Sequence, residues 1–173
     1  MFVKYDGYFT ASTAQWVEFI IPGQGQQLSP QMVFEFGTTL ADHLHPVFGF
    51  VHPVWLGKGQ EYNAAGVLND KELKEYGPQS ICARTWLGPW LVHQIGRDLL
   101  DHCGAVVADT PWGGVTVDLL PDPWTHDIEP LAEARLRVMA ALAPSGVFGD
   151  YSVPRKYKPG PKWTGLPAPT KPT

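Results

Sequence analysis

Residues 83–124, ARTWLGPWLVHQIGRDLLDHCGAVVADTPWGGVTVDLLPDPW, contain the pattern that decides the fold. Residues 80–86 suit a strand, because β-branched and aromatic side chains are common there. The Gly88-Pro89 pair then favours the start of a helix, and Gly104 supplies a left-handed stop. This helix would turn one apolar side inward, formed by Leu91, Val92, Ile95, Leu99 and Leu100. The first unit is therefore a strand followed by a helix.

The second half of the same stretch predicts a hairpin and another helix. Residues 105–109 and 115–120 suit two strands, and the sequence Pro-Trp-Gly-Gly at 111–114 is a good turn between them. Asp127 can cap a last helix that extends to about Ala143. Residues 80–143 thus follow a ferredoxin-like β-α-β-β-α order, to which residues 147–153 could add a strand.

Upstream of this stretch, the chain predicts a strand, a helix and a strand. Residues 14–21 and 47–51 suit the strands. The helix begins after Ser29 and extends to Leu44, with an apolar residue at every fourth position. Glycines mark residues 56–79 as a loop, in which the short charged piece at 70–76 could form one or two helical turns. We therefore expect an α+β fold, with a mixed or antiparallel sheet and helices packed on one of its faces.

The last twenty residues differ from the rest in composition. Residues 154–173 contain six prolines and five bases without any acid, which predicts an extended tail behind a single domain at residues 1–153. We expect this tail to be solvated, and the alternative is that Trp163 folds back onto the domain. Because five of the 13 basic residues lie in the tail, residues 1–153 hold eight bases against 17 acids, a net charge of −9.

Acidic residues gather in one segment of the domain. No Lys or Arg occurs between Arg97 and Arg135, whereas eight carboxylates do: Asp98, Asp101, Asp109, Asp118, Asp122, Asp127, Glu129 and Glu133. Such a segment repels phosphate and attracts a basic partner. It argues against nucleic-acid binding, which needs Lys and Arg on the phosphates.

Other sequence features restrict the location of the chain. Its two cysteines, Cys82 and Cys103, are too few for a disulfide scaffold and lack CxxC spacing. The first twenty residues show no cationic start followed by an apolar core and a cleavage site. No apolar run approaches the ~20 residues that cross a bilayer. We expect a cytoplasmic protein that does not bind a membrane.

Enzyme signatures are weak in this chain. His43, His45 and His52 form the one metal-like cluster, which a metal hydrolase could use, but no HExxH or matching carboxylate spacing accompanies it. Neither a GxSxG nor a GxxxxGK[ST] pattern occurs. We therefore expect no enzyme activity, no metal and no cofactor.

The seven tryptophans have three alternative uses: core packing, stacking on sugars, or anchoring a protein partner. Trp16, Trp86 and Trp90 lie in periodic segments, which favours the core. Trp112 at a turn and Trp124 in a proline-rich loop lie beside the acids, which is typical of interface anchors.

Three segments together resemble a known family. They are ARTWLGPWLVHQIGRDLL at 83–100, PWGGVTVDLLPDPW at 111–124 and PGPKW at 159–163. With a helix between the last two, ending before Phe148 and Tyr151, they resemble the bacterial type VI secretion immunity proteins over roughly residues 14–163. The resemblance implies a cytoplasmic inhibitor, not an enzyme, that neutralises a cognate toxin, often a nuclease.

The residues themselves are compatible with that role. A nuclease holds phosphates in a basic cleft, which an acidic protein can occupy by presenting carboxylates. We predict a partner-binding face that contains Asp109, Trp112, Asp118, Asp122 and Trp124. The alternatives are a carbohydrate-binding or scaffold domain, which would use the tryptophans, and the His-based metal hydrolase.

Overall fold

The computed structural model describes residues 2–8, 14–20, 29–53, 70–153 and 155–167, with backbone alone for the first two ranges. Its centre is an antiparallel four-stranded sheet in the order β3-β4-β6-β5. The strands are β3 (Phe48–Val51), β4 (Arg84–Leu87), β5 (Val106–Asp109) and β6 (Val115–Asp118). The fold is α+β, as the sequence predicts.

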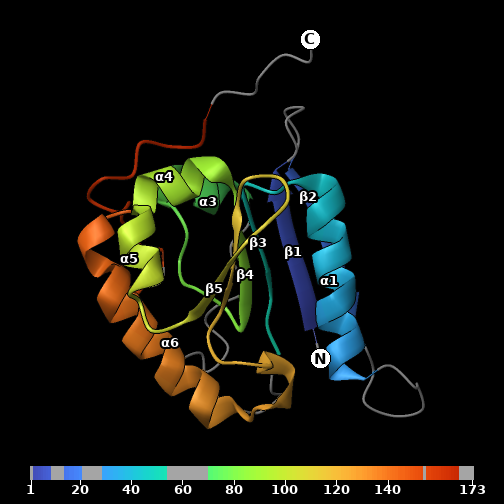
Figure 1. Cartoon of the computed structure of the whole chain (residues 1–173). Coiled ribbons are helices and arrows are strands. Elements are labelled where there is room, and N and C mark those ends of the chain that lie inside the picture. The colour runs from blue at the N-terminus through green and yellow to red at the C-terminus, as the bar shows by residue number, and fades with distance from the viewer. Residues whose placement is uncertain (1, 9–13, 21–28, 54–69, 154, 168–173) are drawn as a thin grey trace.

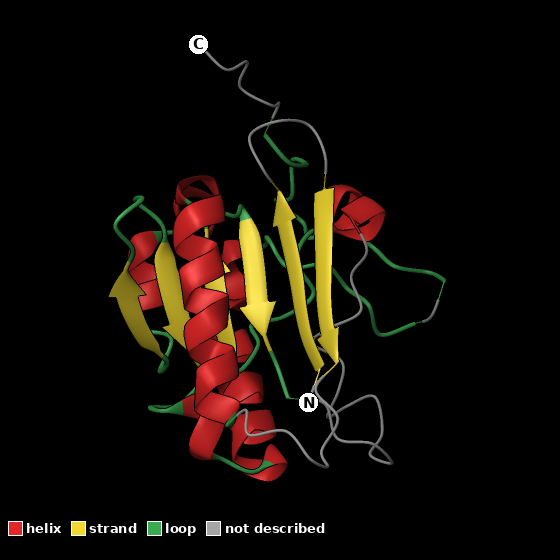
Figure 2. Cartoon of the chain, turned by 90° about the vertical axis from the view of Figure 1, so that its right-hand side faces the viewer, coloured by secondary structure: helices red, strands yellow, loops and turns green. Residues whose placement is uncertain are grey.

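Two further strands form an antiparallel ribbon at one side of this sheet. They are β1 (Phe2–Tyr8) and β2 (Ala14–Ile20), paired from Phe2 opposite Ile20 to Tyr8 opposite Ala14. β1 lies beside β3, so the ribbon continues the layer of strands past that edge (Figure 2). The opposite edge of the central sheet is β5.

Helices cover both faces of the sheet (Figure 1). α1 (Pro30–Leu44) lies on one face, while α4 (Pro89–Ile95), α5 (Arg97–Asp101) and α6 (Ile128–Leu142) lie on the other. The prediction of helices on a single face is therefore wrong. β4 and β6 bury residues of both faces, and a strand buried on both faces needs cover on each side. The other helices are α3 (Asp70–Tyr76), η2 (Pro123–Thr125) and η3 (Ala143–Ser145).

The predicted limits of α1 are confirmed by its caps. The Ser29 hydroxyl accepts a hydrogen bond from the Met32 amide, and Pro30 occupies the first turn. The helix ends at His45, which has a left-handed φ of 46°. Midway along it, Gly37 lets the helix approach the sheet closely, since a Cβ there would lie 2.8 Å from Trp86 Cη2.

The single helix predicted after Gly88 is in fact two short ones. Gly96 has a φ of 95°, which ends α4 and turns the chain into α5. An L-residue rarely adopts that φ, so the glycine permits the break. Both halves still direct leucines into the core, among them Leu91 and Leu100.

The predicted hairpin and last helix are present. β5 and β6 pair antiparallel around the turn at 110–114, where Gly113 has a φ of 86°. Because β5 and β4 each pair antiparallel with β6, they run in the same direction on either side of it. No sheet strand follows α6 in the described residues. The fourth strand of the sheet is β3, which precedes β4 in the chain and pairs with it. The structure therefore does not show the predicted ferredoxin-like order.

The described part of the tail packs against the domain. Asp150 and Lys158 form a β-bridge, and the Gly160 amide donates to the Tyr76 carbonyl at 3.1 Å. Trp163 lies edge-on to Trp90, with ring centroids 5.4 Å apart, and its indole donates to the Lys74 carbonyl. Gly160 and Trp163 thus attach this segment to the domain, most of its other residues are exposed, and the fold-back of Trp163 is observed.

One apolar core unites these elements. Its largest fully buried side chains include Trp86, Phe34, Phe48, Phe50 and Leu73. Among the described residues, no helix is long and apolar enough to span a membrane.

Candidate binding surface

The acidic segment is almost entirely on the surface. Seven of its eight carboxylate residues are exposed, and Asp118 alone is buried. The exposed acids lie on α5, at the end of β5, around η2 and on the first turns of α6. The described residues contain no ion pair to Asp98, Asp122, Asp127 or Glu133. A field of uncompensated negative charge therefore surrounds this part of the molecule.

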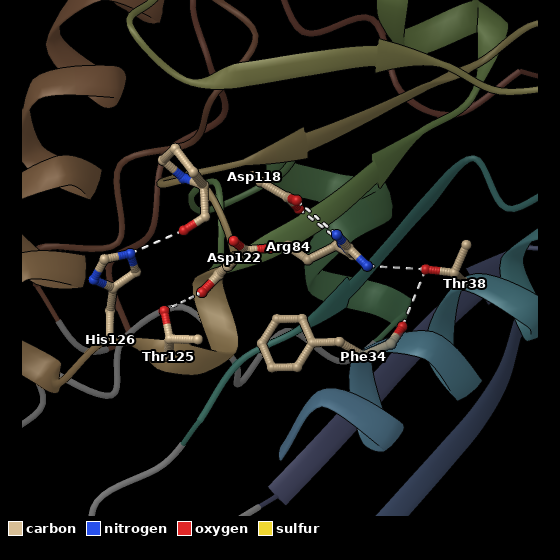
Figure 3. A network of polar contacts seen from close by, with 8 residues as sticks. Phe34, Thr38, Arg84, Asp118, Asp122, Thr125 and His126 are labelled. Atoms are coloured by element: carbon tan, nitrogen blue, oxygen red, sulfur yellow. Dashed lines mark hydrogen bonds and ion pairs between the residues drawn. The ribbon is translucent and has the colours of Figure 1, made fainter. Parts of the chain in front are cut away.

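Asp118 is engaged by Arg84, directly across the β4–β6 pair (Figure 3). Arg84 donates from Nε to Oδ1 at 2.7 Å and from Nη2 to Oδ2 at 2.6 Å, a bidentate pair. Its Nη1 reaches Thr38 of α1 at 3.2 Å. Both side chains are nearly buried, with 14% and 12% exposed. The Arg84–Asp118 pair therefore joins two strands to α1, and each carboxylate oxygen of Asp118 accepts a hydrogen bond from Arg84.

Trp124 belongs to the same cluster. Its ring lies edge-on to Phe34 with centroids 5.8 Å apart, and the Arg84 guanidinium carbon is 5.4 Å from its ring centre. Arg84 also lies 5.8 Å from the Phe34 ring, so one cation contacts two aromatic faces. Trp124 is half-buried and packs within the molecule.

Asp122 lies beside this cluster and faces solvent (Figure 3). It has a left-handed φ of 48°, and its carbonyl accepts from the Thr125 hydroxyl at 2.8 Å and the Thr125 amide at 2.9 Å. The backbone bonds hold the turn, and the carboxylate stays on the surface. Asp122 is therefore available to a partner.

Trp112 lies at the other end of α1. Its indole nitrogen donates to Asp42 Oδ1 at 3.2 Å, and its ring stacks on His45 at 5.5 Å with an interplanar angle of 17°. The ring is half-buried. The turn of the β5–β6 hairpin is thereby fastened to the last turn of α1.

Together these contacts form one line, here called the α1 seam. Phe34, Thr38 and Asp42 lie at intervals of four residues, so they share one side of α1. They contact Trp124, Arg84 and Trp112 in that order. Three of the five predicted site residues, Trp112, Asp118 and Trp124, thus lie along the seam.

Asp109 lies elsewhere, at the end of the edge strand β5. It pairs with Arg97 of α5, which also binds Asp101 at 2.8 Å. Hydrogen bonds to Asp109, and then to Asp101, raise the pKa of Arg97 above its usual value. The Asp109 side chain is 76% exposed, so solvent screens this pair strongly. The structure therefore separates Asp109 from the α1 seam.

Sequence reasoning missed Arg84 and the strand edge. Arg84 lies fourteen positions before Asp98, the first acid of the segment, and only the β4–β6 register places it opposite Asp118. For Asp109 a local signal exists, because Arg97 and Asp101 have the i, i+4 spacing of a helical ion pair. The short apolar run before Asp109 also indicates a strand that the hairpin places at an edge.

The three histidines considered for metal binding make separate contacts. His43 Nδ1 lies 2.7 Å from the Thr39 carbonyl, and His45 stacks on Trp112. His52 is buried, and its Nδ1 accepts from the Ala83 amide at 3.2 Å. Within the described ranges, no group of three or more His, Cys, Asp or Glu residues could hold a metal ion.

No family model, no curated protein and no solved structure matches this chain. The resemblance to immunity proteins therefore stays a prediction.

Proposed function

We propose that this chain is an immunity protein, which binds a cognate secreted antibacterial toxin and neutralises it. The observation that supports this proposal is the exposure of seven acids in a segment of 37 residues without a single Lys or Arg. A basic toxin cleft, such as that of a nuclease, is complementary to such a surface. The family resemblance points in the same direction.

The charge distribution favours fast association with a basic partner. Asp98, Asp122, Asp127 and Glu133 carry no ion pair in the described residues, so their potential extends into solvent. Complementary potentials raise association rates by orders of magnitude at low salt. An inhibitor that must intercept a toxin inside its own cell benefits from this speed.

Tryptophan stacking on a carbohydrate has less support. Among the tryptophans whose side chains the structure describes, Trp86 is fully buried, and four are half-buried in contacts with other parts of the chain: Trp90, Trp112, Trp124 and Trp163. A sugar-binding site needs an aromatic face open to solvent. The proposal for a protein partner does not need one.

The test is neutralisation of a toxin in cells. The chain is used to capture partners from its native bacterium, and each captured toxin encoded beside its gene is expressed with and without the chain. We expect rescue of growth by one tightly bound toxin. If none of the neighbouring toxins, shown to be expressed, is bound and neutralised, the proposal is wrong.

Charge is tested by a matched pair of variants. The first replaces four unpaired acids by their amides: Asp98→Asn, Asp122→Asn, Asp127→Asn and Glu133→Gln. The second keeps every charge: Asp98→Glu, Asp122→Glu, Asp127→Glu and Glu133→Asp. We expect the first to slow association with the toxin about 10-fold or more at low salt, and the second to leave it nearly unchanged.

A further inference from the structure

The edge strand β5 presents unused backbone groups on the border of the acidic surface. The Thr110 amide donates to the Gly114 carbonyl across the hairpin at 3.0 Å. Backbone groups alternate along a strand, so Val106 and Ala108 face β6 as Thr110 does. Val107 and Asp109 consequently direct their amides and carbonyls away from the sheet. β5 is the last strand of its sheet in the described residues.

The register of the neighbouring pair confirms this orientation. The Leu119 amide donates to the Ala83 carbonyl at 3.1 Å, so Leu119 and Val117 face β4. Gly114 and Thr116, which alternate with them, therefore face β5. The hydrogen bonds of both hairpin strands thus indicate independently that the backbone amides and carbonyls of Val107 and Asp109 point away from the sheet.

The two faces of β5 differ in chemistry. Val106 is 46% exposed, and Ala108 next to it on the same face is also exposed. The other face presents Asp109, whose carboxylate lies with Asp101 around Arg97. An added strand would therefore meet exposed apolar side chains on one face, and the half-buried Val107 and the acidic Asp109 on the other.

We propose that the partner docks on this edge by adding an extended, basic strand to β5. The strand would alternate apolar residues beside Val106 and Ala108 with Lys or Arg beside Asp109. Main-chain hydrogen bonds to Val107 and Asp109 supply affinity, and the alternation supplies specificity. This inference rests on the proposed function and names how the toxin, or a peptide from it, is held.

The negative charge of the β5 edge favours a basic strand over a second copy of the chain. An antiparallel pairing of two β5 strands that used both open positions would place the two Asp109 side chains on one face, within two positions of each other. Diagonal neighbours of this kind lie about 7–8 Å apart, so the two carboxylates repel each other. Three acids, Asp98, Asp101 and Asp109, accompany the single Arg97 in residues 97–109, and Arg137 lies near Gly104 at the far end of β5. A basic strand meets a net negative charge there, because Asp101 and Asp109 outnumber Arg97.

The probe is a disulfide-closed hairpin peptide with one strand of alternating Lys and Val. Two controls have the same size: a hairpin with Glu in place of Lys, and one whose outward amides are N-methylated. The methylated control keeps the charge and removes the main-chain donors. Binding to the full chain is measured by fluorescence anisotropy, and amide hydrogen exchange is followed by NMR.

The proposal predicts that the Lys/Val hairpin binds and slows exchange at the Val107 and Asp109 amides. N-methylation is expected to weaken binding about 10-fold, because each lost hydrogen bond leaves a partner unsatisfied. The Glu hairpin is expected not to bind. Equal binding of the methylated hairpin, or absence of binding by the unmodified one, overturns the proposal.

Variants of the chain distinguish the contribution of the Asp109 backbone amide to hairpin binding from that of its charge. Asp109→Pro removes the outward amide and the carboxylate, and proline is tolerated where an edge N–H faces solvent. We expect it to weaken hairpin binding about 10-fold or more, and Asp109→Asn about threefold. Glu35→Gln makes the same charge change on α1, outside the acidic segment, and is expected to bind like the unchanged chain.

The same variants distinguish this inference from the proposed function. If Asp109→Pro, shown to be folded by its thermal transition, still neutralises the toxin fully, docking on β5 is wrong and the immunity role stands. If the hairpin protects Val107 and Asp109 but no toxin is neutralised, the edge is a peptide-binding site and the immunity role is wrong.

Discussion

The α1 seam and the β5 edge contain the same residue types and use them differently. In the seam, the carboxylate of Asp118 is enclosed by Arg84 and by the strand and helix on either side. At the edge, the carboxylate of Asp109 is 76% exposed, and the side chain of its partner Arg97 is 42% exposed. An acid is therefore structural or available according to burial, and the sequence position alone does not distinguish the two.

Removal of the Asp118 carboxylate is expected to have the largest effect on stability. Replacing it with Ala leaves the Arg84 guanidinium nearly buried without its partner, which typically costs about 3 kcal/mol or more of stability. We expect a large decrease of the urea midpoint for Asp118→Ala. The double variant Arg84→Met, Asp118→Leu removes both charges and should recover most of the loss. If Asp118→Ala unfolds like the unchanged chain, the seam is not structural.

Much of the fold follows from local patterns in the sequence. Ser29 and Pro30 fix the start of α1, and the turn at 111–114 fixes the β5–β6 hairpin. Gly96 is a position where local patterns are not sufficient, because a single glycine inside an apolar helical pattern does not reveal whether the helix continues or bends. Local patterns also do not predict that helices pack on both faces of the sheet, since this depends on where α1 packs.

The candidate site is less predictable than the fold. The acidic segment is visible in composition, and its exposure follows from the polarity of its residues. The pairing of Asp118 with Arg84 depends on register between strands that are distant in sequence, and so does the stacking of Trp112 on His45. Long-range register is set by the whole core, so the sequence does not show that a tryptophan in a loop also packs against the rest of the chain.

Trp124 tests whether its role is packing or partner binding. Trp124→Ala removes the contacts with Phe34 and Arg84, which for a half-buried aromatic is expected to cost about 2 kcal/mol of unfolding free energy. Chemical denaturation measures the loss, and toxin affinity is measured below the unfolding transition. A variant with full stability and strongly reduced affinity would show instead that Trp124 is the partner anchor predicted from the sequence.

Tyr151 extends the comparison to a third region, the packed C-terminal segment. Its hydroxyl donates to the Gly77 carbonyl at 2.7 Å and to the Glu72 carbonyl at 3.2 Å, and burial, then nearby acidic groups, raises the pKa of Tyr151 above its usual value. The fold thus favours the neutral phenol. Its contribution is complete below the unfolded pKa of about 10 and is lost as the pH rises through the folded pKa.

The expected outcome is a decrease in unfolding free energy above about pH 10, measured by urea titration at several pH values. Tyr151→Phe should be about 1 kcal/mol less stable at pH 7, because its hydrogen bonds are lost, and should show a weaker decrease at high pH. Parallel curves for the two proteins above pH 10 would show that Tyr151 ionises as freely in the folded state as in the unfolded one.

Asp109 gives the smallest expected change in stability and the sharpest contrast with Asp118. Asp109→Asn removes an exposed ion pair with Arg97, which retains Asp101 as a partner at 2.8 Å, so the thermal midpoint should shift by less than about 2 °C. Differential scanning calorimetry at two salt concentrations measures the thermal midpoints of Asp109→Asn and Asp118→Asn, which carry the same substitution at the two sites. A large, salt-insensitive loss at Asp109 would mean that this carboxylate, like Asp118, holds the fold together, and the strand edge would then lack a freely available acid for a basic partner.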